Sequence, residues 1–273
     1  MMIQRCFIFI SIFWIISCSG QSHQKDLYYD QGMKYVNSQK WKEAVEAFTK
    51  AVNADSTDAD VYDMRGFSYN KLGDYDQAIN DWQKALNLGK YDAPIHINMG
   101  DAYFSLGEYQ DARNLFLIAR KIDSTNQVVN FGLGVCYSKL GNYSSAIKYL
   151  SYDIDLDSTD AESYYVRAIS YQEIKEYKKA IEDYTKAIKF DSNQSKYFVD
   201  RSAALFYSGE YHKAIGDCSH SIKIDPLNLE AFFIRGLAYN EIGEKEKACQ
   251  DFLHLEINNF SKDISEELEE CRK

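Results

Sequence analysis

A period of 34 residues constrains this chain more than any other feature of its sequence. Counted from residue 25, the eighth place of each period holds a small residue and the twentieth holds alanine, seven times without insertion or deletion. The small residues are Gly32, Gly66, Gly100, Gly134, Ala168, Ser202 and Gly236, and the alanines are Ala44, Ala78, Ala112, Ala146, Ala180, Ala214 and Ala248. A fixed period of this length indicates stacked repeats, each of them one supersecondary unit. The units are 25–58, 59–92, 93–126, 127–160, 161–194, 195–228 and 229–262.

Apolar residues within each unit are spaced as on two amphipathic helices joined by a turn. In the second unit they recur every three to five residues over 61–72 and over 78–86, with Gly73 and Asp74 between. Proline would interrupt such helices, and the chain has only two in 273 residues. Asp, Ser and Asn side chains at the unit boundaries, as in 55–58, can cap the helix that follows. The sequence therefore predicts an all-α chain of helix pairs.

Two aromatic columns complete the pattern. Tyrosine stands eleventh in every unit except at Leu205, and an aromatic residue stands seventeenth except at Lys245. Together with the small residue, the turn glycine and the repeated alanine, this order closely resembles the tetratricopeptide repeat. The resemblance covers 25–262 and implies a right-handed superhelical solenoid of seven helix-turn-helix units, with a capping helix over 263–273. Ala168 and Ser202 depart from the glycine of that pattern without breaking the period.

Arginine stands seventh in four units, and the same four units carry an aspartate sixteen residues later. The pairs are Arg65 with Asp81, Arg167 with Asp183, Arg201 with Asp217, and Arg235 with Asp251. The first, third and fourth units have neither residue. Because the two places face each other in an antiparallel helix pair, we predict one ion pair inside each of the four units. Its role is structural, since a partly buried ion pair mainly fixes the register of the helices.

The resemblance also implies a concave groove lined by the first helix of each unit, at its second, fifth, ninth, twelfth and thirteenth places. We expect the partner-binding residues there: Tyr29, Met33, Asp63, Phe67, Asp101, Phe104, Phe131, Tyr165, Phe206 and Phe233. Charged residues at these places sum to a formal charge of −5. An acidic groove with aromatic residues favours a protein or peptide partner that carries apolar anchors and basic residues. The alternative for any single residue is that it packs against neighbouring helices.

Cys249 and Cys271 face each other if a last helix, capped by Ser261, folds back near residue 260. One expectation is a disulfide between them, because an exported protein meets oxidising conditions. Two free buried thiols are the other expectation.

Cysteine and histidine offer no further site by their spacing. The chain has no CxxC, and His212, Cys218 and His220 lack the additional ligands that a metal would need. No nucleophile–base order, phosphate-binding loop or zinc-protease motif occurs either. We therefore expect a protein without metal, cofactor or enzymatic activity.

The first seventeen residues are typical of an export signal. One positive charge precedes an apolar run over 6–17, which is too short to span a membrane as a helix. Ile15-Ile16-Ser17-Cys18 ends this run and resembles the lipobox of bacterial lipoproteins, which implies cleavage before Cys18 and lipidation of Cys18. Residues 18–24 would form a tether, and Ser19 favours the outer membrane of the bacterial envelope over the inner one. The alternatives are an ordinary secretory signal with a chance cysteine and an uncleaved anchor.

Composition excludes one class of partner. The formal net charge is −10 and no run of Lys or Arg occurs, so nothing attracts nucleic acid. We expect a lipid-anchored scaffold at the cell envelope that binds a partner segment in the groove. The alternative is an assembly subunit of a secretion, pilus or outer-membrane machine, docking folded partners through convex or end surfaces. The sequence leaves the oligomeric state and the partner's identity open.

Overall fold

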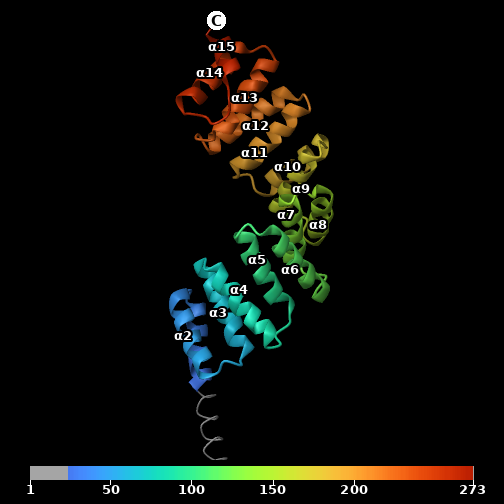
Figure 1. Cartoon of the computed structure of the whole chain (residues 1–273). Coiled ribbons are helices and arrows are strands. Elements are labelled where there is room, and N and C mark those ends of the chain that lie inside the picture. Colours follow the sequence, from blue (N-terminus) through green and yellow to red (C-terminus); the bar gives the residue numbers. More distant parts are fainter. Residues whose placement is uncertain (1–23, 273) are drawn as a thin grey trace, which may run out of the picture. The chain divides into compact units, whose positions relative to one another are not determined.

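The structure is a computed structural model that describes residues 24–272, and every regular element in that range is a helix (Figure 1). Residues 24–37 are helical and are followed by fourteen further helices. These are α2 (Trp41–Ala54), α3 (Ala59–Leu72), α4 (Tyr75–Asn87), α5 (Ala93–Ser105), α6 (Tyr109–Ile122), α7 (Gln127–Lys139), α8 (Tyr143–Leu156), α9 (Ala161–Glu173), α10 (Tyr177–Phe190), α11 (Ser195–Tyr207), α12 (Tyr211–Ile224), α13 (Leu229–Glu241), α14 (Lys245–Ile257) and α15 (Ser265–Cys271). The all-α array of helix pairs expected from the period is confirmed.

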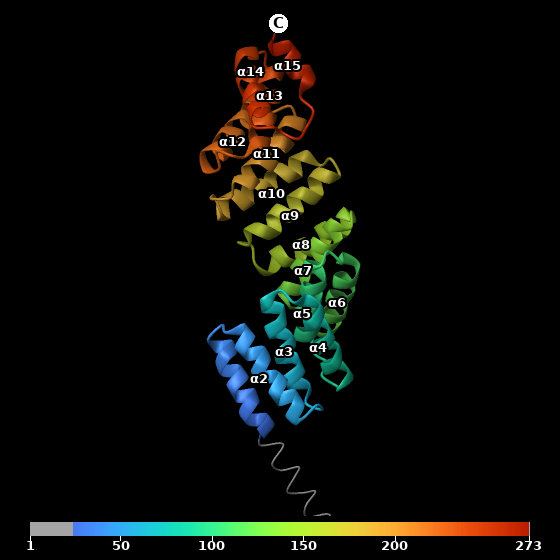
Figure 2. The same cartoon turned by 60° about the vertical axis from the view of Figure 1, so that its left-hand side comes forward.

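The chain divides into two compact units, one ending at Gly132 and the other beginning at Leu133, within α7. The N-terminal unit contains the helix over 24–37 and α2 to α6, and the C-terminal unit contains α8 to α15. In each unit, consecutive helices follow one another side by side, as the two views show (Figures 1 and 2).

Short turns make each helix pair antiparallel. Two or three residues separate the first helix of a pair from the second, so the chain must reverse direction there. Five of these turns place a glycine at a φ of about +74° to +82°, where a side chain would be strained. Gln39 and Lys175 take the same position in the first and fifth repeats with φ of 55° and 61°.

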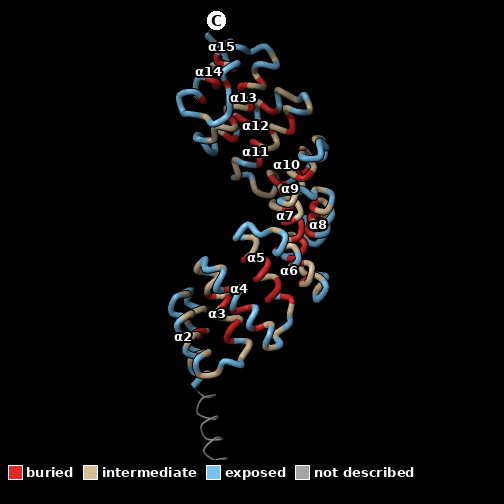
Figure 3. The backbone as a smooth tube through the Cα atoms, viewed as in Figure 1, coloured by how far each residue is buried: buried red, intermediate tan, exposed pale blue. Residues whose placement is uncertain are grey.

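The small-residue column allows the two helices of a pair to approach closely. A Cβ atom on Gly32 would stand 2.5 Å from the ring of Phe48, sixteen residues later in α2. The sixth repeat has Ser202 in this column, and there the large residue is replaced by Cys218, whose thiol donates to Ser202 Oγ at 3.1 Å. Buried residues recur along the helices of both units, with exposed residues between them (Figure 3).

Side-chain caps begin helices at the unit boundaries and, at Asn142, in the turn within the fourth unit. The side chains of Asp58, Asp92, Asn142, Asp160 and Asn228 each accept a hydrogen bond from a backbone N–H in the first turn of the next helix.

The last helix differs from its expected bounds. α15 begins at Ser265 rather than at 263, and Asp263, not Ser261, accepts the hydrogen bond from the Ser265 N–H at 3.0 Å. Ile264 and Leu268 are buried against α14, so the short helix covers the apolar end of the array.

The expected signal segment and Cys18 lie outside the described residues. Gln24, expected in the tether, is already helical. No helix within residues 24–272 has the length and apolar character needed to cross a membrane.

Candidate partner-binding surface

Each of the four arginines with a predicted aspartate partner holds three helices together. In the N-terminal unit, Arg65 Nε and Nη2 donate to the two carboxylate oxygens of Asp81, both at 2.7 Å. Its Nη1 donates to Thr49 Oγ1 of the preceding repeat at 3.2 Å. The same arrangement joins Arg167 to Asp183 and Ser151, Arg201 to Asp217 and Thr185, and Arg235 to Asp251 and Ser219. We call each set of three residues an arginine clamp.

Sequence reasoning missed the hydroxyl partner of each clamp, although the sequence contains the signal. A Ser or Thr stands sixteen residues before each of the four arginines. Where Met99 and Leu133 replace the arginine, Gln83 and Leu117 stand at that place instead. In the seventh repeat, the hydrogen bonds to Asp251 raise the pKa of Arg235 although the side chain is partly buried. The clamps thus act within the scaffold and leave the guanidinium groups unavailable to a ligand.

Three predicted groove residues of the N-terminal unit join neighbouring helices. Tyr29 and Met33 are half-buried and pack against the core around Phe48, whose ring centroid lies 5.7 Å from that of Tyr29. Asp63 accepts a hydrogen bond from Trp82 Nε1 at 3.0 Å and pairs with Lys90 Nζ at 2.8 Å. These three side chains therefore serve the packing of the repeats.

Phe67 and Phe104 also contact aromatic neighbours, but each ring keeps one part open to solvent. The Phe67 centroid lies 6.0 Å from that of Trp41, and Lys71 Nζ lies 5.2 Å above the Phe67 ring. The Phe104 ring lies 5.1 Å from Tyr109. Phe131 in α7 is half-buried as well. Partly exposed rings of this kind can still receive an apolar group.

Asp101 differs most from the other predicted groove residues, because its side chain is not part of the packing between helices. It lies on α5, one turn after Ile97 and three residues before Phe104, so the three share a helix face. Its carboxylate is exposed, yet surrounding protein desolvates it and raises its pKa from 3.8 to about 6, a change that the charge of Lys71 only partly offsets. No basic group among the described residues forms an ion pair with it.

Tyr165 belongs to a polar network between the fifth and sixth repeats in the C-terminal unit. Its hydroxyl donates to Asp200 Oδ2 at 2.7 Å, and Lys196 Nζ lies 4.6 Å from its ring centroid. Lys196 also pairs with Glu162 at 3.2 Å, and Glu162 accepts a hydrogen bond from the Tyr197 hydroxyl at 2.7 Å. Burial raises the pKa of Asp200, with a further contribution from the charge of Glu230. Sequence reasoning missed Asp200, which stands at a place that holds no repeated residue.

Phe206 and Phe233 also have partners in the C-terminal unit. Phe206 contacts the rings of Tyr207 and Tyr211 at 5.7 and 5.4 Å. Phe233 contacts Phe260 at 5.4 Å and has Lys262 Nζ 4.9 Å above its ring.

The formal charge of −5 overstates the acidity of the first-helix faces. Five of the eight carboxylates counted there form ion pairs with lysines. Three of these lysines, Lys25, Lys90 and Lys262, stand outside the five places that were counted. The acids at the second place of a repeat therefore bind lysines of the same or the next repeat, which a count along the first helices cannot include.

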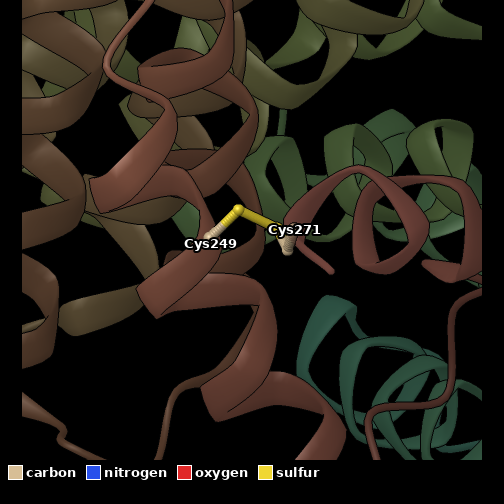
Figure 4. The surroundings of a disulfide bond; sticks show 2 residues. All are labelled: Cys249 and Cys271. Atoms are coloured by element: carbon tan, nitrogen blue, oxygen red, sulfur yellow. A yellow bond between two sulfur atoms is a disulfide. The ribbon is translucent and has the colours of Figure 1, made fainter. Parts of the chain in front are cut away.

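A disulfide joins Cys249 in α14 to Cys271 in α15, where the two side chains point toward each other (Figure 4). The Cα atoms are 5.4 Å apart, and the bond closes a segment of 22 residues. It ties the short terminal helix to the last helix pair.

In the described part of the chain, Cys218, His212 and His220 do not come together as a site. Burial raises the pKa of the Cys218 thiol to about 12, so it stays protonated at neutral pH. His212 and His220 are exposed. Within residues 24–272, no three His, Cys, Asp or Glu side chains gather as a metal site would require.

Several solved structures with a similar fold are described as tetratricopeptide-repeat proteins. The C-terminal part of a TPR repeat-containing protein from Cytophaga hutchinsonii has a TM-score of 0.71 at 20% identity, covering 88% of this chain and 99% of that one. A tetratricopeptide repeat protein from Parabacteroides merdae has a TM-score of 0.66 at 18% identity, covering 92% and 100%. YrrB, described as a TPR protein with an unusual peptide-binding site, has a TM-score of 0.60 at 22% identity, covering 68% and 96%. Identities this low establish the fold alone.

Family models give the same result from the sequence. The TPR repeat matches residues 66–106, and the tetratricopeptide repeat matches 97–161 and 161–194. No curated protein matches the chain. Residues 66–194 therefore match tetratricopeptide-repeat models, and the helix pairs of residues 24–272 have the fold of that family.

Proposed function

We propose that this protein is a non-catalytic scaffold that binds a segment of a protein partner on the first-helix face of its N-terminal unit. The observation that carries the proposal is Asp101, an exposed carboxylate on α5 whose pKa is raised by desolvation and which forms no ion pair with a lysine or arginine among residues 24–272. A desolvated charge is costly unless it is paired. A cation supplied by a partner would remove this cost.

Apolar surface beside Asp101 defines the rest of the proposed ligand. Ile97 and Phe104 flank the carboxylate on α5, and both are half-buried. A partner segment that places a lysine or arginine at Asp101 and an apolar side chain on Phe104 would use both features. Such a segment is extended or helical, because either form places side chains at regular intervals along the face that contacts α5. The peptide-binding site reported for YrrB shows that one protein of this fold binds peptides.

The test reverses the charge of Asp101. The partner is captured by crosslinking in its own membrane and compared between the natural chain, Asp101→Lys, and the control Asp111→Lys, an exposed carboxylate on α6. We expect Asp101→Lys to reduce the crosslinked partner at least tenfold and the control to retain it. Equal capture by Asp101→Lys and the natural chain would refute the proposed site.

Charge reversal is a cleaner test than alanine substitution of the aromatic residues. Phe67 packs against the core cluster that contains Trp82 and Met99, so its removal lowers stability as well as binding. Circular dichroism of Asp101→Lys shows whether its fold is intact.

We also propose that a lipid on Cys18 anchors the scaffold to the bacterial envelope, preferentially at the outer membrane. The support is the apolar run over 6–17 followed by Ile15-Ile16-Ser17-Cys18. Metabolic labelling with an alkyne fatty acid should mark the natural chain and not Cys18→Ser. A Cys18→Ser chain that still sediments tightly with membranes would contradict lipid anchoring.

A second candidate function is that of an assembly subunit of an envelope machine that docks folded partners through its convex or end surfaces. It is favoured by a pocket in the C-terminal unit that Ile181, Leu205 and Lys213 help to line.

A further inference from the structure

The sixth repeat lacks the tyrosine that stands eleventh in every other repeat. Leu205 on α11 takes its place and is buried at 3% exposure. In the fifth and seventh repeats the same place holds Tyr171 and Tyr239, both half-buried at the surface of the C-terminal unit. The three positions can be compared directly, since all belong to one compact unit.

A lysine covers the tyrosine ring in both neighbouring repeats. Lys179 Nζ lies 5.6 Å from the Tyr171 centroid and pairs with Glu176 at 3.4 Å. Lys247 Nζ lies 5.5 Å from the Tyr239 centroid and pairs with Glu244 at 3.1 Å.

The sixth repeat keeps the lysine and loses the ring. Lys213 pairs with Glu210, just as its counterparts pair three residues back along the second helix. It has no aromatic residue beneath it, because Leu205 ends short of the place that a tyrosine ring occupies. The sixth repeat therefore retains one half of a cation–π contact.

A cavity of about 360 Å³ lies where the ring is missing. Its lining residues are Ile181, Thr185, Arg201, Leu205, Lys213 and Asp217. Arg201, Asp217 and Thr185 form an arginine clamp, so their polar atoms already have partners. What the cavity offers a ligand is an apolar floor of Ile181 and Leu205 beneath the ammonium group of Lys213. We call it the Leu205 pocket.

We infer that the Leu205 pocket receives a tyrosine side chain of a partner protein. In both neighbouring repeats the place of Leu205 holds the chain's own tyrosine, and Ile147 and Ile215 stand at the places that correspond to Ile181. An aromatic ring gains apolar contact with the floor and electrostatic attraction from the lysine, and a phenol keeps its hydroxyl near solvent. The pocket is lined by α10, α11 and α12 of the C-terminal unit, so it is independent of the Asp101 site on α5.

The test uses p-cresol, the side chain of tyrosine, and methyl-labelled natural protein. The ligand should shift the methyl resonances of Ile181 and Leu205 in a saturable manner. The methyl groups of Ile147 and Ile215, which stand at the corresponding places before the repeats that carry the tyrosine, are the internal control. Absence of the Ile181 and Leu205 shifts, or equal shifts at all three isoleucines, would overturn the inference whatever the variants do.

Two substitutions separate the contributions of shape and charge. Leu205→Tyr fills the cavity with the chain's own ring and should weaken p-cresol binding at least tenfold. Lys213→Met removes the cation and should weaken it about two- to fivefold. 4-Methylcyclohexanol, of similar size without the π system, should bind more weakly than p-cresol. Undiminished binding to folded Leu205→Tyr, or tighter binding of the saturated analogue, would contradict a tyrosine site.

Discussion

The second and third repeats belong to the same compact unit, yet different interactions hold their helix pairs together. In the second repeat, Arg65 forms two hydrogen bonds to Asp81 and a third to Thr49 of the repeat before. In the third, the corresponding places hold Met99, exposed by only 3%, and Leu115, which packs against the same core cluster. The same helix-pair backbone therefore forms with an arginine–aspartate ion pair or with two apolar residues at these places. The two kinds of contact differ in directionality. The planar guanidinium forms directional hydrogen bonds that fix three helices in one geometry, whereas an apolar contact does not.

Removing the aspartate of one arginine clamp while keeping its arginine should have the largest effect on the free energy of unfolding. Asp81→Ala leaves the Arg65 guanidinium partly buried without its carboxylate, which costs about 3 kcal/mol of unfolding free energy. Urea denaturation measures this cost, and Gln77→Ala, an exposed change on the same helix, should stay within about 0.5 kcal/mol. If Asp81→Ala is as mild as the control, the clamp does not hold the second repeat.

The seventh repeat sharpens the comparison because it combines a clamp with a covalent bond. Replacing Cys249 and Cys271 by serine opens a 22-residue loop and should cost about 3 kcal/mol in the local stability of α14 and α15. The effect should be local, because a helix as short as α15 is not stable alone. Hydrogen exchange should report faster exchange of α15 amides, with the amides of α9 unchanged. Unaltered α15 protection would show that apolar contacts suffice there.

Removing the link to the preceding repeat should have a smaller effect. Thr49→Val keeps the shape of the side chain and deletes the hydroxyl that accepts from Arg65, at a cost of about 1 kcal/mol. Gln83→Leu changes the same place before a repeat that has Met99 instead of arginine, and should stay within about 0.5 kcal/mol. Equal costs at the two places, measured by thermal unfolding, would remove the distinction between clamped and unclamped repeats.

Converting a clamped repeat into an apolar one should be nearly neutral. The double variant Arg65→Met with Asp81→Leu copies the third repeat and should change the free energy of unfolding by about 1 kcal/mol or less, because replacing an ion pair by apolar residues avoids desolvation. A double-mutant cycle with the single variants gives the coupling energy. A double variant as unstable as Asp81→Ala would mean that the clamp is required for net stability and not only for geometry.

Titration of Asp101 gives the smallest effect and concerns the third repeat alone. Its raised folded-state pKa means that the folded state binds a proton more readily than the unfolded state. Its contribution to stability is therefore greatest below about pH 4 and declines as the pH rises to about 6. Carboxyl NMR should show a midpoint near 6, and Asp101→Asn should remove this part of the pH dependence. A midpoint near 3.8 would contradict the desolvation on which the proposed binding site depends.

The fold could be predicted from the sequence because a repeat array is built from local contacts. Each helix pair contacts mainly its neighbours, so a pattern within 34 residues describes the core. The pairing of Arg65 with Asp81 followed from a spacing of sixteen residues within one repeat. Only details of helix ends differed, as at α15, which begins at Ser265 and where Asp263 rather than Ser261 accepts the hydrogen bond from the Ser265 N–H.

The candidate surface was less predictable, because neighbouring repeats contribute to it. Lys90 and Lys262 neutralise carboxylates on the first helices, although both stand between repeats. The Tyr165 hydroxyl meets Asp200 across 35 residues, a distance that no helical spacing indicates. Places on a helix identify a face, but they do not say which of its side chains already have partners.

The sequence by itself determined that this protein is an array of helix pairs, and where each pair begins and turns. Helix periodicity, turn glycines and small residues act over a few residues, so they can be recognised without coordinates. Only the tertiary structure decided that Asp101 stays unpaired while other acids bind lysines. It also decided that Leu205 leaves a cavity beneath Lys213. Both outcomes depend on where neighbouring repeats place their side chains, and that placement is set by packing between repeats rather than within one.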